Sequence, residues 1–135
     1  MCYFVYGAMD KAVNLKDYER VKKKHDFVFN IGTKQDIKMS IVNESHDYRV
    51  TRWVCDCDFP LGLKNREAEE INELQALIEE LRTVSDAKCL YLSKTWIGTK
   101  NKKEETFHLD DVDIKDFLAN METDCLYRID LFNRY

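Results

Sequence analysis

Two aspartates and two cysteines alternate in one short run, which is the strongest candidate for chemistry in this chain. Asp56 and Asp58 alternate with Cys55 and Cys57 in the sequence WVCDCDFPLG at positions 53–62. In an extended strand, successive side chains point to opposite faces, so the aspartates share one face and the cysteines the other. Carboxylate oxygens are the ligands that a hard cation such as Mg²⁺ prefers. We therefore predict a divalent-cation or small-ligand site at Asp56 and Asp58.

The neighbours of this run support the same prediction. The run ends a predicted strand over residues 48–58 and precedes a predicted helix over residues 66–82. In open sheets with crossover helices, ligands bind beyond the carboxyl ends of strands, where the two aspartates fall. Lys94 and Asp110 each follow a later predicted strand. We expect Lys94 to join the aspartates as a catalytic residue, and Asp110 to join them as a ligand of Mg²⁺.

The sequence DCDFPL at positions 56–61 resembles the opening motif of the haloacid-dehalogenase-like phosphatases. The resemblance implies that Asp56 attacks phosphorus and that Asp58 acts as acid and base. It also implies that Ser93-Lys94 and Asp110-Asp111 supply the later motifs of that family. The activity implied is that of a phosphoryl-transfer hydrolase.

The two cysteines of the run offer another interpretation. Residues two apart in a strand lie about 6.6 Å apart along its axis, whereas a disulfide needs Cβ atoms about 3.5–4.5 Å apart. Cys55 and Cys57 are therefore expected to be buried thiols, or half of a zinc site that Cys2, Cys89, Cys125 or a histidine completes. The odd total of five cysteines favours free thiols in a reducing cytoplasm.

Length and charge restrict the class of protein. A chain of 135 residues suits one domain, here residues 1–135. The net charge of −4, from 21 basic and 25 acidic residues, gives no basic surface for nucleic acid. No apolar run approaches the roughly 20 residues of a membrane helix, and the first residues lack the pattern of a signal peptide. We expect a cytoplasmic protein with neither nucleic acid nor membrane as partner.

The spacing of apolar residues predicts an α/β fold, with α+β as the alternative. The expected element order is β-α-β-β-β-α-β-β-α-β, which gives one mixed sheet of about six or seven strands flanked by three helices. A hairpin loop is expected over residues 98–103. The predicted strands cover residues 2–6, 27–31, 37–41, 48–58, 87–92, 105–109 and 125–132. The predicted helices begin after caps at Asn14, Asn65 and Asp113. Leu15, Tyr18 and Val21 fall at three-residue spacing, which predicts a short amphipathic helix that reaches about Lys24.

The aromatic residues support a function without catalysis. Several are expected at the surface, where aromatic side chains are enriched in protein interfaces. They are Trp53, Tyr91, Trp96, Tyr127, Phe132 and Tyr135. The three histidines, His25, His46 and His108, are also expected at the surface. The sequence thus leaves open a ligand site or enzyme at the aspartates, an interaction domain that forms a homodimer or binds a protein partner, and a thiol or zinc site.

Overall fold

A computed structural model describes residues 3–11, 13–25, 30–31, 46–49, 62–96 and 102–132 of the chain. The aspartate and cysteine run at positions 53–61 lies outside these residues, so the site predicted at Asp56 and Asp58 stays a prediction. Trp53 and Tyr135 also lie outside them. The predictions for the whole chain as one domain and for its cytoplasmic location likewise stay predictions.

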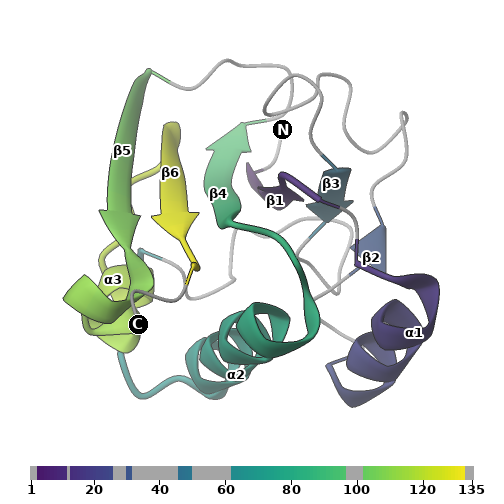
Figure 1. Ribbon diagram of the computed structural model, residues 1–135. Coiled ribbons are helices and arrows are strands. Elements are labelled where there is room, and N and C mark those ends of the chain that lie inside the picture. Colours follow the sequence, from purple (N-terminus) through teal and green to yellow (C-terminus); the bar gives the residue numbers. More distant parts are fainter. Residues whose placement is uncertain are drawn as a thin grey trace.

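The described residues form strands and helices that are mixed along the chain (Figure 1). The strands are β1 (Tyr3–Met9), β2 (Asn30–Ile31), β3 (His46–Arg49), β4 (Cys89–Trp96), β5 (Lys103–His108) and β6 (Cys125–Asp130). The helices are α1 (Leu15–Lys24), α2 (Glu69–Val84) and α3 (Ile114–Ala119), and a 3-10 turn, η1 (Leu109–Asp111), follows β5.

The described strands form one mixed sheet in the order β2-β3-β1-β4-β6-β5. The longer strands β1, β4, β6 and β5 form its body. The pairs β2 with β3, β3 with β1, β1 with β4, and β4 with β6 are antiparallel, and β5 pairs with β6 in parallel. A mixed sheet with three helices is therefore confirmed, in keeping with an α/β or α+β fold.

The expected hairpin between the fourth and fifth described strands is wrong. Strand β6 lies between β4 and β5, so these two strands are not neighbours. The chain passes from β5 through η1 and α3 before it returns as β6 alongside β5. A parallel pair needs such a crossover, usually a helix. The expected strand over residues 37–41 and most of that over 48–58 lie outside the described residues, so the full element order is not established.

The helices pack against one face of the sheet, and all three lie on the same side of the strands in Figure 1. Alternate residues of the strands meet the helices in one buried cluster, as the two-residue period of a strand requires. The strand residues of this cluster include Val5, Met9, Leu90, Leu92, Tyr127 and Ile129. The α2 residues are Ile71, Leu74, Leu77, Ile78 and Leu81, as the sequence pattern predicts. Burial of each such side chain stabilises the fold by about 1.5–3 kcal/mol.

Two of the three predicted helix caps are confirmed. The Asn14 side chain accepts a hydrogen bond from the Lys16 N–H at 2.9 Å, and Asp113 accepts from two N–H groups of the first turn of α3. Asn65 does not cap α2, which begins at Glu69 without a side-chain cap. Leu15 is 68% exposed, so it lies outside the buried face that Tyr18 and Val21 form. It occupies the first position of α1, and only the following turns of that helix reach the core through Tyr18 and Val21.

Across the described segments, every helix is too short or too polar to cross a bilayer.

Candidate functional site

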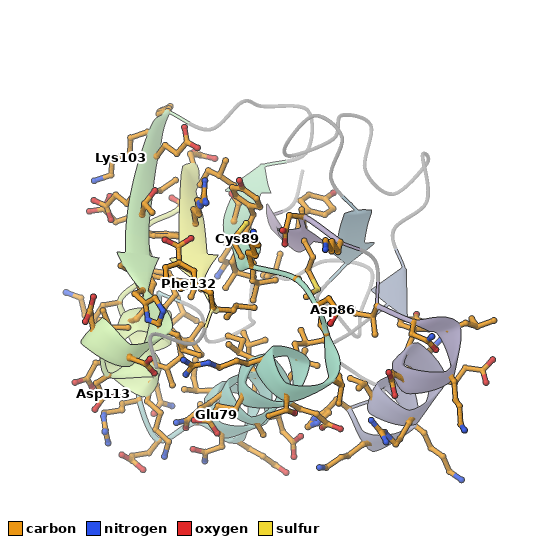
Figure 2. The ribbon with its side chains drawn as sticks, in the orientation of Figure 1. Glu79, Asp86, Cys89, Lys103, Asp113 and Phe132 are labelled. Carbon is orange, nitrogen blue, oxygen red and sulfur yellow. The ribbon has the colours of Figure 1, made fainter. Side chains whose placement is uncertain are left out.

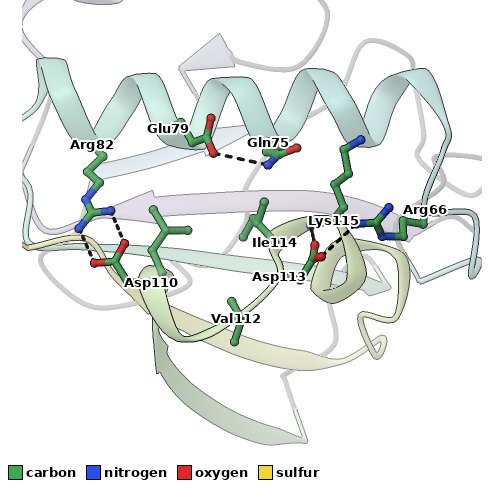
Figure 3. Close-up of a pocket in the computed structure, with 10 residues that line it drawn as sticks. Arg66, Gln75, Glu79, Arg82, Asp110, Val112, Asp113, Ile114 and Lys115 are labelled. Atoms are coloured by element: carbon green, nitrogen blue, oxygen red, sulfur yellow. Dashed lines mark hydrogen bonds and ion pairs between the residues drawn. The ribbon is translucent and has the colours of Figure 1, made fainter.

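A pocket of about 400 Å³ lies between α2, the turn η1 and the start of α3 (Figure 3). This volume falls within the roughly 300–1,000 Å³ of small-molecule sites in proteins. The pocket is lined by Arg66, Gln75, Glu79, Arg82, Leu109, Asp110, Val112, Asp113, Ile114 and Lys115. One wall comes from α2 and the residues just before it, and the other comes from residues 109–115.

Arg82 and Asp110 form one end of the pocket. The guanidinium Nη1 and Nη2 donate to the two Asp110 carboxylate oxygens at 2.6 and 2.8 Å, and Nε donates to the Leu131 carbonyl at 3.0 Å. Paired hydrogen bonds of this kind fix both side chains in one plane. The Asp110 N–H also donates to His108 Nδ1 at 3.1 Å. Asp110, predicted as a metal ligand, therefore has both carboxylate oxygens bound to an arginine.

Arg66 forms the other end of the pocket. It donates to Asp113 at 2.9 Å, to Asp116 at 2.6 Å and to Glu67 at 3.0 Å. The hydrogen bond to Asp113, followed by those to Asp116 and Glu67, raises the pKa of Arg66. The same hydrogen bond from Arg66, with the N–H of Asp116, lowers the pKa of Asp113. The ion pairs at the two ends thus join α2 and its entry turn to η1 and α3.

The middle of the pocket combines an apolar floor with two further charges. Leu109 and Ile114 are 8% and 5% exposed. Gln75 donates to the Glu79 carboxylate at 3.4 Å. Among the described residues, neither Glu79 nor the Lys115 ammonium has an ion-pair partner. These two side chains extend from opposite walls (Figure 3).

The formal charges around the pocket cancel. Three basic side chains, Arg66, Arg82 and Lys115, stand against three acidic ones, Glu79, Asp110 and Asp113. A ligand of this pocket therefore meets groups of both signs rather than a cluster of carboxylates or a cluster of cations.

Lys94, predicted as a catalytic residue, is buried in the sheet. It is 3% exposed and lies opposite Val5 of β1, on the face that the helices cover. Its carbonyl accepts a hydrogen bond from the Asp124 N–H at 2.9 Å.

Lys94 and Asp110 are not brought together. If the β4–β6 register continues by two residues, Lys94 lies opposite Cys125, at the start of β6. Asp110 follows His108, which pairs with Asp130 at the other end of β6. Cys125 and Asp130, at the two ends of β6, are five residues apart in the strand, which separates them by about 17 Å. Figure 2 likewise shows Lys103 and Asp113 at opposite ends of this part of the molecule. This separation gives no support to a single site that contains both Lys94 and Asp110.

The chain that follows the aspartate run is anchored to α3. The Gly62 N–H donates to the Leu118 carbonyl at 2.9 Å, and the Lys64 N–H donates to the Ala119 carbonyl at 2.7 Å. Gly62 has φ +77°, and a Cβ at this position would lie 2.3 Å from the Met121 carbonyl oxygen. Only glycine fits this backbone geometry without displacing the Met121 backbone, which follows α3.

The two described cysteines cannot share one metal. Both are free thiols, 2% and 0% exposed for Cys89 and Cys125. Burial raises the pKa of each thiol. The register places Cys89 beside Asp130 on one face of the sheet and Cys125 on the face of Tyr127, which is the opposite one. Within the described segments, there is no group of three or more His, Cys, Asp or Glu side chains suited to a metal ion.

His25 and His108 are buried, so the prediction of surface histidines is wrong for both. His25 is 2% exposed, and its Nε2 and Nδ1 lie 2.9 and 3.4 Å from carboxylate oxygens of Glu80 and Glu73 on α2. His108 is 4% exposed, and its Nε2 donates to the Phe132 carbonyl at 2.7 Å. Each lies where two elements pack together, which the residue's position in the sequence does not reveal.

The aromatic residues divide between core and surface. Tyr127 is 4% exposed and packs edge-to-face on Phe117, with ring centroids 4.8 Å apart, so its predicted exposure is wrong. Its hydroxyl accepts from the Glu122 N–H, and burial raises its pKa to about 12. Phe132 is 47% exposed, in agreement with its predicted place at the surface.

Comparison of the chain with protein-family models, with curated proteins and with solved structures found no match. Most of the pocket residues were not predicted from the sequence. Arg82 and Asp110 are 28 positions apart, and Arg66 and Asp113 are 47 apart, so no local pattern joins them.

Proposed function

We propose that this protein is a small-ligand-binding domain and that its ligand occupies the pocket between α2 and α3. The observation that carries the proposal is the pair of arginine–aspartate contacts at the two ends of a 400 Å³ pocket. These contacts hold both walls in place before a ligand arrives. Pre-organisation lowers the entropic cost of binding.

A polar organic ligand suits the pocket better than a metal ion. Asp110 and Asp113 are already engaged by arginines, and a cation there would have to displace a guanidinium. The apolar floor at Leu109 and Ile114 offers contact to carbon atoms. Sites for small molecules commonly join an apolar surface to a few polar groups that fix orientation.

An NMR titration tests the proposal. The panel holds amino acids, sugars and nucleosides at millimolar concentration, and backbone amide shifts of residues 75–82 and 109–115 are followed. At least one class of compound should shift these amides in a saturable way. In Arg66→Gln the same titration should show weaker binding, whereas Arg128→Gln, which alters an arginine–aspartate pair outside the pocket, should bind as the parent does. A panel that leaves every pocket amide unmoved would contradict the proposal.

A second candidate is a Mg²⁺-dependent phosphoryl-transfer site at Asp56 and Asp58, assisted by Lys94 but without Asp110. The burial of Lys94 and the anchoring of Gly62 support it. Asp58 precedes Gly62 by four residues, which span at most about 14 Å. The Gly62 N–H donates to the Leu118 carbonyl in α3. A few residues after Leu118, the Asp124 N–H donates to the Lys94 carbonyl, so Gly62 and Lys94 both contact this part of the chain.

Metal-dependent stability tests this second candidate. A ligand that binds only the native state raises stability, by about 2.7 kcal/mol at a concentration of 100 times Kd. Added Mg²⁺ should therefore raise the Tm of the protein, and Asp56→Asn should abolish that rise while the fold survives. A Tm that stays constant across Mg²⁺ concentrations would count against this site.

Self-association through aromatic surface is the third candidate. Among the described residues, the exposed side chain of Phe132 supports it. Sedimentation should then show a mass that rises with concentration, and Phe132→Ser should reduce that rise. A monomer mass at every concentration would contradict self-association.

A further inference from the structure

We infer that the ligand of the α2–α3 pocket is a zwitterion, a molecule with a carboxylate at one end and an ammonium group at the other. The inference rests on the proposed function and adds the chemical class of the ligand. It follows from which charges of the pocket are already paired and which are not.

Most of the charge around the pocket is satisfied within the protein. Arg82 binds both carboxylate oxygens of Asp110, and Arg66 binds Asp113. Each of these contacts joins a cation of one wall to an anion of the other. They close the two ends of the pocket and leave the middle open.

The two remaining charges have opposite signs and lie on opposite walls. Glu79 belongs to α2 and is held by the side-chain amide of Gln75, one helical turn away. Lys115 belongs to α3, and its backbone N–H is held by the Asp113 carboxylate. In the described part of the chain, neither charge has an ion-pair partner. Both side chains line the pocket, and in Figure 3 Glu79 lies along α2 while Lys115 reaches from the start of α3 toward α2, beside Arg66.

A ligand with both charges matches this arrangement. Its carboxylate accepts hydrogen bonds from the Lys115 ammonium, and its ammonium group donates to Glu79. The carbon chain between its ends lies on the apolar floor of Leu109, Val112 and Ile114. A simple anion engages only Lys115, and a simple cation engages only Glu79. The other side chain is then left without a partner beside a partly desolvated ligand, and this weakens binding.

A series of ω-amino acids tests the inference. The probes are glycine, 4-aminobutyrate and 6-aminohexanoate, with hexanoate and hexylammonium as singly charged controls. Backbone amide shifts of the pocket residues give each Kd. One of the amino acids should bind at least about tenfold more tightly than either singly charged control, a ratio that corresponds to one charge-assisted hydrogen bond.

Charge variants assign the two ends of the probe. Glu79→Gln and Lys115→Gln should each reduce affinity for the zwitterion to near that of a singly charged control. The double variant with Glu79→Lys and Lys115→Glu should regain affinity, because it exchanges the charges and the probe binds in reverse. Glu69→Gln removes an exposed α2 carboxylate outside the pocket and should change nothing. Dispersed amide spectra confirm that each variant is folded.

The outcomes separate this inference from the proposed function. If hexanoate or hexylammonium binds as tightly as every amino acid, or if the double variant fails to recover affinity, the ligand is not a zwitterion although the pocket binds ligands. If the zwitterions leave the pocket amides unmoved while sugars or nucleosides shift them, the class is again wrong and the pocket stands. If neither panel shifts these amides, both proposals are overturned.

Discussion

Helix α2 carries two charged clusters, and they differ in how deeply their groups are buried. On the α1 side, the His25 side chain is 3% exposed between Glu73 and Glu80, with Lys24 also bound to Glu80 at 3.3 Å. On the α3 side, the side chains of Arg82, Asp110, Arg66 and Asp113 are 21% to 49% exposed around a pocket. The first cluster fills the space between two helices, whereas the second leaves it open.

This difference in burial assigns different roles to clusters of similar composition. Hydrogen bonds between buried charged groups hold elements together because breaking one leaves a desolvated group without a partner. Exposed ion pairs contribute little to stability because water competes for them. The group of His25, Glu73, Glu80 and Lys24, called the α1 cluster, should therefore stabilise the fold. The arginine–aspartate pairs around the pocket, called the α3 cluster, should contribute to ligand binding.

The largest effect is expected at His25. His25→Ala removes both contacts to the α2 carboxylates and should lower the free energy of unfolding by about 2–3 kcal/mol. Urea unfolding measures the change, and Glu19→Gln on the exposed face of α1 serves as the control. A variant as stable as the parent would show that the buried cluster does not hold α1 to α2.

A smaller effect is expected at Arg82. Arg82→Gln removes the paired hydrogen bonds to Asp110 and should lower the free energy of unfolding by about 1–2 kcal/mol, since the side chain is only partly buried. The same urea experiment measures it. A loss larger than that of His25→Ala would reverse the comparison between the two clusters.

The pH dependence of stability should also reflect the cluster beside α1. Burial tends to raise the pKa of Glu80, but hydrogen bonds from His25 and Lys24 outweigh it, so the pKa is lowered from 4.5. A lowered carboxyl pKa contributes stability that is fully present above the unfolded value and is lost as the pH falls through the folded value. Stability should therefore decline below about pH 5. Glu80→Gln should flatten this decline, and an unchanged decline in that variant would assign it to other carboxylates.

The smallest effect is expected at Arg66. This side chain is 45% exposed, and its contacts compete with water. Arg66→Gln should leave the midpoint of urea unfolding nearly unchanged while it weakens ligand binding in the pocket. A large loss of stability would mean that the α3 cluster is structural, as the α1 cluster is.

Local features of the fold were predictable from the sequence, and contacts between distant residues were not. Asn14 and Asp113 were recognised because a cap bonds to residues two or three positions away. The apolar face of α2 followed from helical periodicity alone. The hairpin prediction failed because β6, which separates β4 from β5, comes later in the chain than both.

The candidate site shows the same limit. The position of Asp110 after a predicted strand indicates a functional residue, but its partner Arg82 lies in another element. Glu79 and Lys115 resemble ordinary surface charges in the sequence, and only packing places them beside one pocket. Burial of Lys94 and His25 also depends on neighbours far along the chain. The prediction at Asp56 and Asp58 concerns residues outside the described segments and remains to be tested.

The most direct test of the central claim is the titration of the protein with 6-aminohexanoate, followed by the amide shifts of residues 75–82 and 109–115. Saturable shifts confined to these residues, weakened by Glu79→Gln and unaffected by Glu69→Gln, are the result that we predict. Pocket amides that stay unmoved by this probe, by the shorter amino acids and by the wider panel would contradict the account.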